Sequence, residues 1–133
     1  MEDYCEHVIY EKNPEVGGTW YENQYPGVAC DVPAHIYTFT WAGNPSMSAI
    51  RCLTLTNWCA EWSHFYVKGP EIRQHIKNVA KEYNLEKNIQ FNSKVLEATW
   101  LEEEGKWQVK VDINGTVKFD KADVVINASG VLK

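Results

Sequence analysis

The chain has 133 residues, with 13 Lys and Arg against 18 Asp and Glu, and its formal net charge is -5. A chain of this length forms one domain of ordinary size and can bury roughly two thirds of its unfolded surface. The hydrophobic share of 44% argues against intrinsic disorder, and no run approaches the roughly 18–20 consecutive apolar residues of a membrane span. The acidic balance and the lack of a basic cluster in the sequence argue against nucleic-acid binding.

The four cysteines, Cys5, Cys30, Cys52 and Cys59, form no C-x-x-C pair. Cys52, Cys59 and His64 are the best candidates for a metal site, but their spacing matches no zinc signature. We therefore expect no metal, and we interpret the cysteines as thiols of a reducing, cytoplasmic environment. The sequence also has no segment that is typical of a signal peptide.

The first predicted element is a buried parallel strand over residues 7–11, where the apolar run Val8-Ile9-Tyr10 ends at Glu11. Residues 12–45 contain many Gly, Pro, Asn and Tyr residues and show no helical period, so we expect an ordered loop with room for one short helix. A long loop of this kind inside a domain is usually functional. Its aromatic side chains either pack in the core, which we favour, or line a pocket.

A helix is predicted over residues 70–83. Pro70 suits its first position, and Glu71 suits the positive end of the helix dipole. The apolar residues of this segment recur at helical spacing on one face: Ile72, Ile76, Val79, Ala80 and Tyr83. A short strand is expected next, at residues 89–91.

Alternating apolar and polar residues predict an antiparallel β-meander over residues 94–120. Within it, Asn114-Gly115 is typical of a two-residue hairpin turn. The run at 122–127 is continuously apolar at its centre, which is typical of a strand buried on both faces of a parallel sheet. Parallel strands, a helix and an inserted meander together predict an α/β fold.

Three motifs resemble those of the class B flavoprotein monooxygenases, the family of Baeyer–Villiger and flavin-containing monooxygenases. They are Val8-Ile9-Tyr10-Glu11-Lys12, Val16-Gly17-Gly18-Thr19-Trp20 and Tyr25-Pro26-Gly27-Val28-Ala29-Cys30-Asp31. The similarity continues through Gly69-Pro70-Glu71-Ile72 and the meander to Ala128-Ser129-Gly130, and it is strongest to Baeyer–Villiger and related fungal enzymes. The resemblance implies that residues 1–133 form a partial FAD-binding, Rossmann-like domain with a doubly wound parallel sheet and an inserted meander.

The resemblance also implies roles for individual residues. Glu11, with Lys12 beside it, ends a strand, and its carboxylate accepts hydrogen bonds from the adenosine ribose. Gly17 and Gly18 allow close backbone approach to the cofactor, and Thr19 and Trp20 lie beside the ribityl and pyrophosphate region. Asp31 and Tyr37 lie near the flavin and nicotinamide, with Asp31 as the catalytic residue. The backbone of Val95 reads the adenine edge, and Ala128, Ser129 and Gly130 pass the cofactor.

Each of these residues also has an ordinary structural explanation. Glu11 can be a solvated carboxylate at a strand end, and Gly17 and Gly18 can form a plain tight turn. Trp20 can be a core residue, and Asp31 can cap a helix or a turn. We prefer the cofactor roles because the motifs occur together, in the order and spacing of the family.

The family chemistry is reduction of FAD by NADPH and reaction with O2 to a C4a-(hydro)peroxyflavin, which oxygenates a ketone, nitrogen or sulfur centre of a small molecule. The alternative is a non-catalytic fragment, or a small domain that binds a partner or ligand. The family's first strand with its Gly-x-Gly-x-x-Gly loop, and its NADPH domain, have no counterpart in this sequence. We therefore expect a truncated fragment that is inactive by itself.

Two further expectations follow from the differences between this sequence and the family pattern. Without the central strand, residues 7–11 and 122–127 lose their shared neighbour, so their unpaired backbone groups and apolar faces must rearrange, pair with another chain or stay exposed, which permits self-association. Residues 46–61 have no counterpart in the family, and we hypothesise that they are a translated retained intron; the alternative is a genuine insertion.

Overall fold

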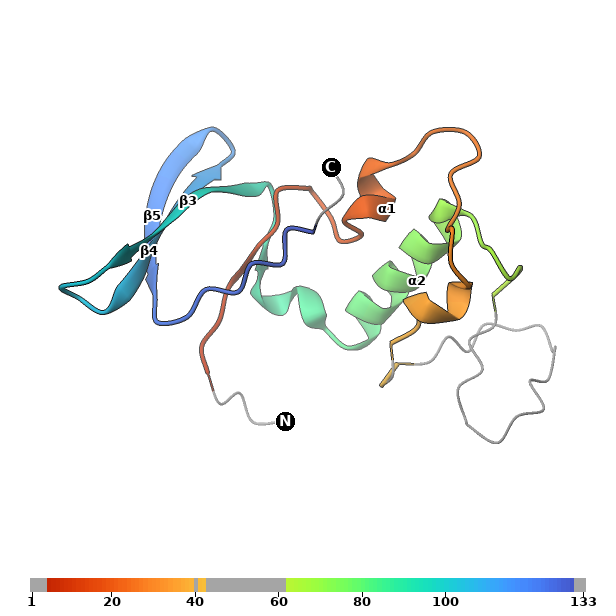
Figure 1. Cartoon of the computed structure of the whole chain (residues 1–133), viewed down its shortest axis with the longest axis horizontal. Coiled ribbons are helices and arrows are strands. Elements are labelled where there is room, and N and C mark those ends of the chain that lie inside the picture. The colour runs from red at the N-terminus through yellow and green to blue at the C-terminus, as the bar shows by residue number, and fades with distance from the viewer. Residues whose placement is uncertain (1–4, 40, 43–61, 131–133) are drawn as a thin grey trace. The chain divides into compact units, whose positions relative to one another are not determined.

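The computed structural model describes residues 5–39, 41–42 and 62–130, and the chain divides into two units (Figure 1). Unit 1 consists of Met1–Val16 and Leu85–Lys133, and unit 2 consists of Gly17–Asn84. The unusual segment at 46–61 lies outside the described residues, so its origin stays a hypothesis. Among the described helices, none has the length and apolar character that are needed to cross a membrane.

The predicted meander is confirmed in unit 1, where three antiparallel strands follow one another in the order β3-β4-β5 (Figure 1). Their bounds are Ser93–Leu101 for β3, Lys106–Ile113 for β4 and Thr116–Ala122 for β5. Val109 and Val111 alternate with polar residues along β4, and both are buried. The predicted hairpin turn is also present, since Asn114 and Gly115 both have positive φ, at 52° and 83°.

A short parallel pair precedes the meander in the same unit. Strand β1 (Ile9–Tyr10) pairs with β2 (Ile89–Gln90), which follows the short 3-10 helix η2 (Leu85–Asn88). The parallel direction of the first strand is as predicted, but its burial is not, because Ile9 is 47% exposed. Within the described residues, β1 pairs only with β2, so one edge of β1 has no strand beside it.

The strand predicted at 122–127 is wrong. Strand β5 ends at Ala122, and the residues after it belong to no strand of the described chain. Val124 is 73% exposed and Ile126 is 85% exposed. An apolar run becomes a buried strand only where neighbouring strands accept its backbone hydrogen bonds, and the described residues provide no such neighbour. Of the three outcomes expected for the two apolar segments, exposure is therefore the one that is observed.

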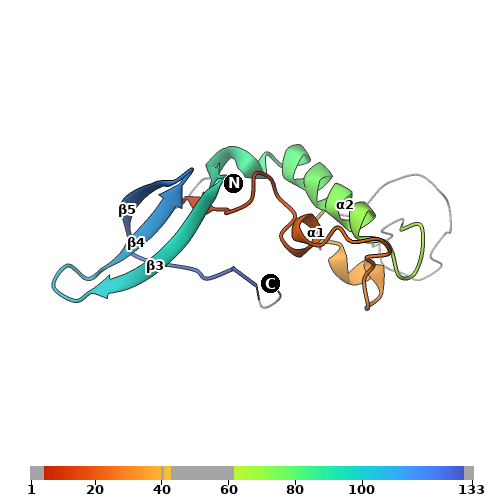
Figure 2. The same cartoon turned by 90° about the horizontal axis from the view of Figure 1, so that it is seen from above.

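The dominant element of unit 2 is helix α2 (Gly69–Glu82), which agrees with the predicted helix to within one residue at each end. Ile72 on its apolar face is fully buried. The core of the unit consists of Cys30, Ala34, Val67 and Ile72, with Trp20, Tyr37, Trp62 and Ile76 packed against it. The loop before α2 contains two short helices, α1 (Thr19–Glu22) and the 3-10 helix η1 (Ala34–Tyr37). Figure 2 shows α1 alongside the N-terminal half of α2.

Candidate functional site

Residues Gly17 to Trp20 form a tight turn that leads into α1. The amide of Trp20 donates a hydrogen bond to the carbonyl of Gly17 at 3.0 Å. Gly18 has φ 50° and ψ -120°, the geometry of the first central position of a type II′ turn, which strongly favours glycine. A Cβ atom on Gly18 would have no atom within 4 Å, so one side of this turn is open. A tight glycine turn is therefore present, and close approach of a cofactor to it stays a prediction.

Trp20, Asp31 and Tyr37 come together in unit 2. The ring of Trp20 meets the ring of Tyr37 edge to face, with centroids 5.2 Å apart. Burial and then the nearby charge of Asp31 raise the pKa of Tyr37 above its ordinary value of 10.0. The Tyr37 phenol therefore keeps its proton and can donate a hydrogen bond, while the exposed Asp31 carboxylate can accept one.

Two backbone segments hold this group in place. The amide of Cys30 donates to the carbonyl of Val67 at 3.0 Å, and the amide of Gly69 donates to the carbonyl of Val28 at 2.9 Å. These bonds fix the segment before Asp31 against the start of α2. The core of unit 2 thus holds Trp20 and Tyr37 in place, and Asp31 follows Cys30 of that core.

Glu11 and Val95 belong to unit 1, in which a backbone ladder connects their segments. The amide of Glu11 donates to the carbonyl of Gln90 at 3.0 Å, and the amide of Ser93 donates to the carbonyl of Glu11 at 2.9 Å. The Oε1 atom of Glu11 accepts a hydrogen bond from the amide of Asn13 at 2.8 Å. Glu11 therefore stands at the end of a parallel strand, as predicted, and Val95 lies two residues into the adjoining strand β3.

The remaining predicted site residues are not gathered into a cluster. Lys12 is exposed, and so are Ala128, Ser129 and Gly130, in the segment that follows the meander. Gly130 has φ 77°, a conformation that favours glycine. The amide of Ser129 donates to the Oδ1 atom of Asn127 at 3.1 Å, which is a local contact. Their cofactor roles stay predictions.

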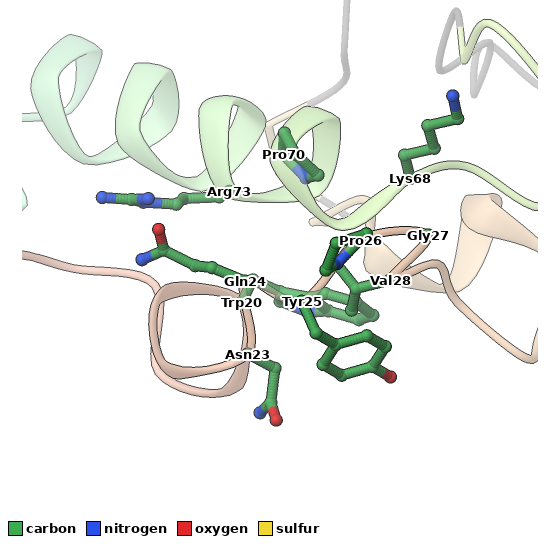
Figure 3. Close-up of a pocket in the computed structure, with 10 residues that line it drawn as sticks. All are labelled: Trp20, Asn23, Gln24, Tyr25, Pro26, Gly27, Val28, Lys68, Pro70 and Arg73. Carbon is green, nitrogen blue, oxygen red and sulfur yellow. The ribbon is translucent and has the colours of Figure 1, made fainter.

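Unit 2 also contains a pocket of about 310 Å³ that the sequence analysis missed (Figure 3). Its lining includes Gln24, Tyr25, Lys68 and Arg73, and none of the described lining residues is acidic. Figure 3 shows the side chains of Arg73 and Gln24 next to each other on one side of the pocket. No sequence motif indicates this pocket, because residues more than forty positions apart in the chain form it.

No site for a metal ion is formed by the part of the chain that the structure describes, where no three His, Cys, Asp or Glu side chains are grouped. Cys30 is buried and free, and Cys5 is exposed and free. Cys52 and Cys59 of the rejected zinc pattern lie outside the described residues.

Comparisons with known proteins agree with this architecture. A family model described as an NAD(P)-binding Rossmann-like domain matches residues 2–51. An FAD-binding monooxygenase of Aspergillus terreus is 42% identical over 130 residues, which are 98% of this chain and 20% of that protein. A Baeyer–Villiger monooxygenase of Streptomyces coelicolor is 34% identical over 131 residues, or 98% of this chain and 22% of the relative.

Solved structures show the same relationship. The open crystal structure of cyclohexanone monooxygenase matches with a TM-score of 0.72 and 30% identity, over 94% of this chain and 22% of that chain. A cyclohexanone monooxygenase from Rhodococcus sp. Phi1 bound to NADP+ matches with the same TM-score and identity, over 94% of this chain and 21% of that chain. The chain thus spans about a fifth of the length of the relatives it matches. Over nearly its whole length the chain is therefore similar to one part of FAD-binding monooxygenases, Baeyer–Villiger enzymes among them.

Proposed function

We propose that this chain contributes FAD contacts to a monooxygenase that uses NADPH and O2 to oxygenate a small molecule. The observation that carries the proposal is the open type II′ turn at Gly17-Gly18, found in a chain that is 42% identical to an FAD-binding monooxygenase. Catalysis by the 133 residues alone is not expected, because they match only about a fifth of the relatives' length. The proposed substrate is a small molecule that is oxygenated at a ketone, nitrogen or sulfur centre.

The open space beside the turn in unit 2 supports a role in holding the cofactor. The space beside Gly18 is open, so a ligand can approach the backbone more closely than any side chain would permit. The backbone at Gly17, Gly18 and Thr19 would hold the ribityl and pyrophosphate region. Trp20 would fix the turn, because its ring is anchored against the core and Tyr37.

Glu11 in unit 1 fits the adenosine end. The Asn13 amide hydrogen bond engages Oε1 of Glu11, and the described residues provide no hydrogen bond to Oε2. A carboxylate oxygen with spare acceptor capacity at the end of a parallel strand can accept from ribose hydroxyls. The backbone of Val95 would then contact the adenine edge.

Asp31 and Tyr37 would act at the flavin end. Bound FAD would supply the redox chemistry between NADPH, O2 and the substrate, with one oxygen atom going to the substrate and the other to water. The Asp31 carboxylate would accept a hydrogen bond from the nicotinamide amide, and the protonated Tyr37 hydroxyl would serve as a donor beside it. Both residues bind and orient, and neither acts as a nucleophile.

A titration of the purified chain with FAD, followed by flavin fluorescence and by the visible spectrum, tests the binding proposal. Loss of the Glu11 charge in Glu11→Gln should weaken FAD binding by roughly tenfold or more, because hydrogen bonds to charged groups are the strong ones. The matched control is Glu103→Gln, at an exposed turn of the meander. A colourless protein that binds no added FAD would favour the non-catalytic alternative.

A segment exchange tests the activity. The chain would replace the matching part of the Aspergillus terreus relative, and FAD content and NADPH oxidation would be measured. We expect a flavin-containing chimera whose NADPH oxidation falls when Asp31→Ala is introduced. A folded chimera without flavin would contradict the proposed role.

We also propose that the free edge of β1 allows two copies of the chain to associate. Val8 and Ile9 are 46% and 47% exposed, and a strand edge with apolar side chains is a ready pairing surface. Sedimentation velocity over a concentration range measures this directly. Val8→Lys should reduce any dimer fraction, and a chain that stays monomeric at all concentrations would refute the association.

A cytoplasmic location is part of the same proposal. It is supported by the free thiols of Cys5 and Cys30, since free cysteines are common in a reducing compartment. Fractionation of cells that express the protein from its own gene would test it, and recovery in a secreted fraction would contradict it.

A further inference from the structure

Helix α1 has only four residues, so its own hydrogen bonds cannot determine its orientation. An isolated helix of this length is unstable in water, because the entropy lost in fixing the first turn outweighs the free energy of its few hydrogen bonds. No side chain caps its N-terminus at Gly18. The position of α1, and of the Gly17–Gly18 turn that precedes it, must therefore depend on contacts with the rest of unit 2.

Arg73 on α2 supplies such a contact on one side of α1. Its guanidinium carbon lies 4.9 Å from the ring centroid of Tyr21, within the range of a cation–π interaction. The stem of the same side chain reaches the turn, since a Cβ atom placed on Gly17 would be 3.6 Å from Cγ of Arg73. One side chain of α2 thus touches both the helix and the space beside its leading glycine.

Trp20 supplies a second contact between α1 and α2. A Cβ atom on Gly69 would lie 3.2 Å from Cε3 of Trp20, so this ring rests directly on the first residue of α2. Trp20 and Tyr21 are neighbours in α1, and both rings are held by α2 or by residues packed against it. Helix α1 is therefore clamped to α2 through two adjacent aromatic side chains.

We infer that Arg73 is a positioning residue for the FAD-binding turn, holding α1 through the ring of Tyr21 and so aligning Gly17 and Gly18. This role rests on the proposed function, because it concerns the turn assigned there to the cofactor. Arg73 is not placed in contact with FAD. Its removal should loosen the turn and leave the fold of α2 in place.

Hydrogen–deuterium exchange of the full chain without FAD tests the clamp itself. The amides of Tyr21, Glu22 and Asn23 donate hydrogen bonds within and after α1, so peptide 17–24 reports on its opening. Arg73→Met, which keeps the stem and removes the charge, should raise exchange there by roughly two- to fivefold. Peptide 74–82 of α2 is the internal reference and should not change.

Three variants make this measurement specific. Arg73→Lys keeps a cation near the ring and should recover most of the protection. Lys81→Met, at an exposed position of the same helix, is the matched control and should exchange like the original protein. The inference would be overturned if Arg73→Met changed the exchange of peptides 17–24 and 74–82 by the same factor. It would also be overturned if Lys81→Met raised the exchange of peptide 17–24 as much as Arg73→Met does.

A second readout separates this inference from the proposed function. FAD affinity should fall about two- to fivefold in Arg73→Met and remain unchanged in Lys81→Met. If Glu11→Gln weakens FAD binding and Arg73→Met does not, the positioning role is wrong and the proposed FAD role stands. If the exchange result is as expected but neither variant affects FAD, the clamp exists and the proposed cofactor role is wrong.

Discussion

Gly69 at the start of α2 lies so close to Trp20 that a Cβ atom on residue 69 would be 3.2 Å from Cε3 of the indole ring. The same Cβ would be 3.0 Å from Cγ1 of Val28. Val28 is buried, and its carbonyl is bonded to the amide of Gly69, so it has little room to move. This contact makes residue 69 a sensitive probe of how the loop packs on α2.

Gly69→Ala should destabilise unit 2 by about 1–2 kcal/mol, because overpacking outweighs the better helix propensity of alanine. Urea unfolding followed by tryptophan fluorescence measures the change. Val28→Ala, which removes the crowding methyl groups, should make the substitution at residue 69 much less costly in the double variant. Additive costs in the two variants would show that the crowding at Val28 is not the cause.

The conformation of Gly18 predicts a graded response to substitution. With φ 50° and ψ -120°, the position has open space but a backbone geometry that L-residues resist. Gly18→Asn should cost about 1 kcal/mol, and Gly18→Val should cost about 2–3 kcal/mol, since Asn tolerates positive φ and β-branched residues do not. Thermal unfolding gives the ranking, and equal costs for the two variants would refute the backbone explanation.

Tyr10 connects β1 with the meander, because its hydroxyl donates to Oδ2 of Asp120 at 2.7 Å. Burial, this hydrogen bond and the Asp120 charge raise the pKa of Tyr10 from 10.0 to about 12. The folded state therefore holds this proton more tightly than the unfolded state. The resulting stability is present below pH 10 and is lost as the pH rises from 10 to about 12.

Tyr10→Phe should lower stability by about 0.5–1.5 kcal/mol at neutral pH and should flatten the stability profile between pH 10 and 12. Chemical unfolding at a series of pH values tests both effects. Tyr25→Phe, at a tyrosine that is 61% exposed, is the control and should keep the original profile. A profile for Tyr10→Phe that remains as steep as the original would contradict the assignment.

His75 is expected to have the opposite effect, a loss of stability at acid pH. It is 5% exposed, its ring centroid lies 6.0 Å from that of Phe39 and 5.1 Å from that of Trp62, and its Nε2 atom has no hydrogen-bond partner among the described residues. Burial lowers its pKa below the ordinary 6.5, so the folded state resists protonation. The stability that depends on neutral His75 is full above pH 6.5 and is lost as the pH falls below it.

His75→Phe should therefore remove part of the acid-induced loss of stability and raise stability at neutral pH by about 1 kcal/mol, because it removes an unsatisfied buried nitrogen. Thermal unfolding between pH 4 and 8 is the measurement. His64→Phe, at an exposed histidine, should leave the acid limb of the profile in place. Loss of that limb in the control variant, or its retention in His75→Phe, would show that His75 is not its source.

The elements that depend on local pattern were predicted well. Helix α2 begins with Pro70 in its first turn and buries Ile72, Val79 and Ala80, because helical spacing decides which side chains share a face. The meander follows from alternation, which is strict in β4, and from the Asn114-Gly115 turn, whose backbone requirement only a few residue types meet. The glycine turn at Gly18 was predictable for the same reason.

The predictions that failed concern partners that are distant in the sequence. The apolar run around Val124 has the composition of a buried strand, yet it remains exposed, because burial depends on which strands lie beside it. The Arg73–Tyr21 contact was also not foreseen, since the two residues lie 52 positions apart and no motif joins them.

The amino-acid sequence was sufficient to recognise the resemblance to flavoprotein monooxygenases, the α/β class and most of the separate elements, because spacing, turn chemistry and motifs are local properties of the chain. The tertiary structure alone decided which of those elements are covered and which stay exposed, and it revealed that α1 is held against α2 through the side chains of Trp20 and Tyr21. Burial and side-chain contact are properties of the space around a residue, and that space is filled by segments that the local pattern does not specify.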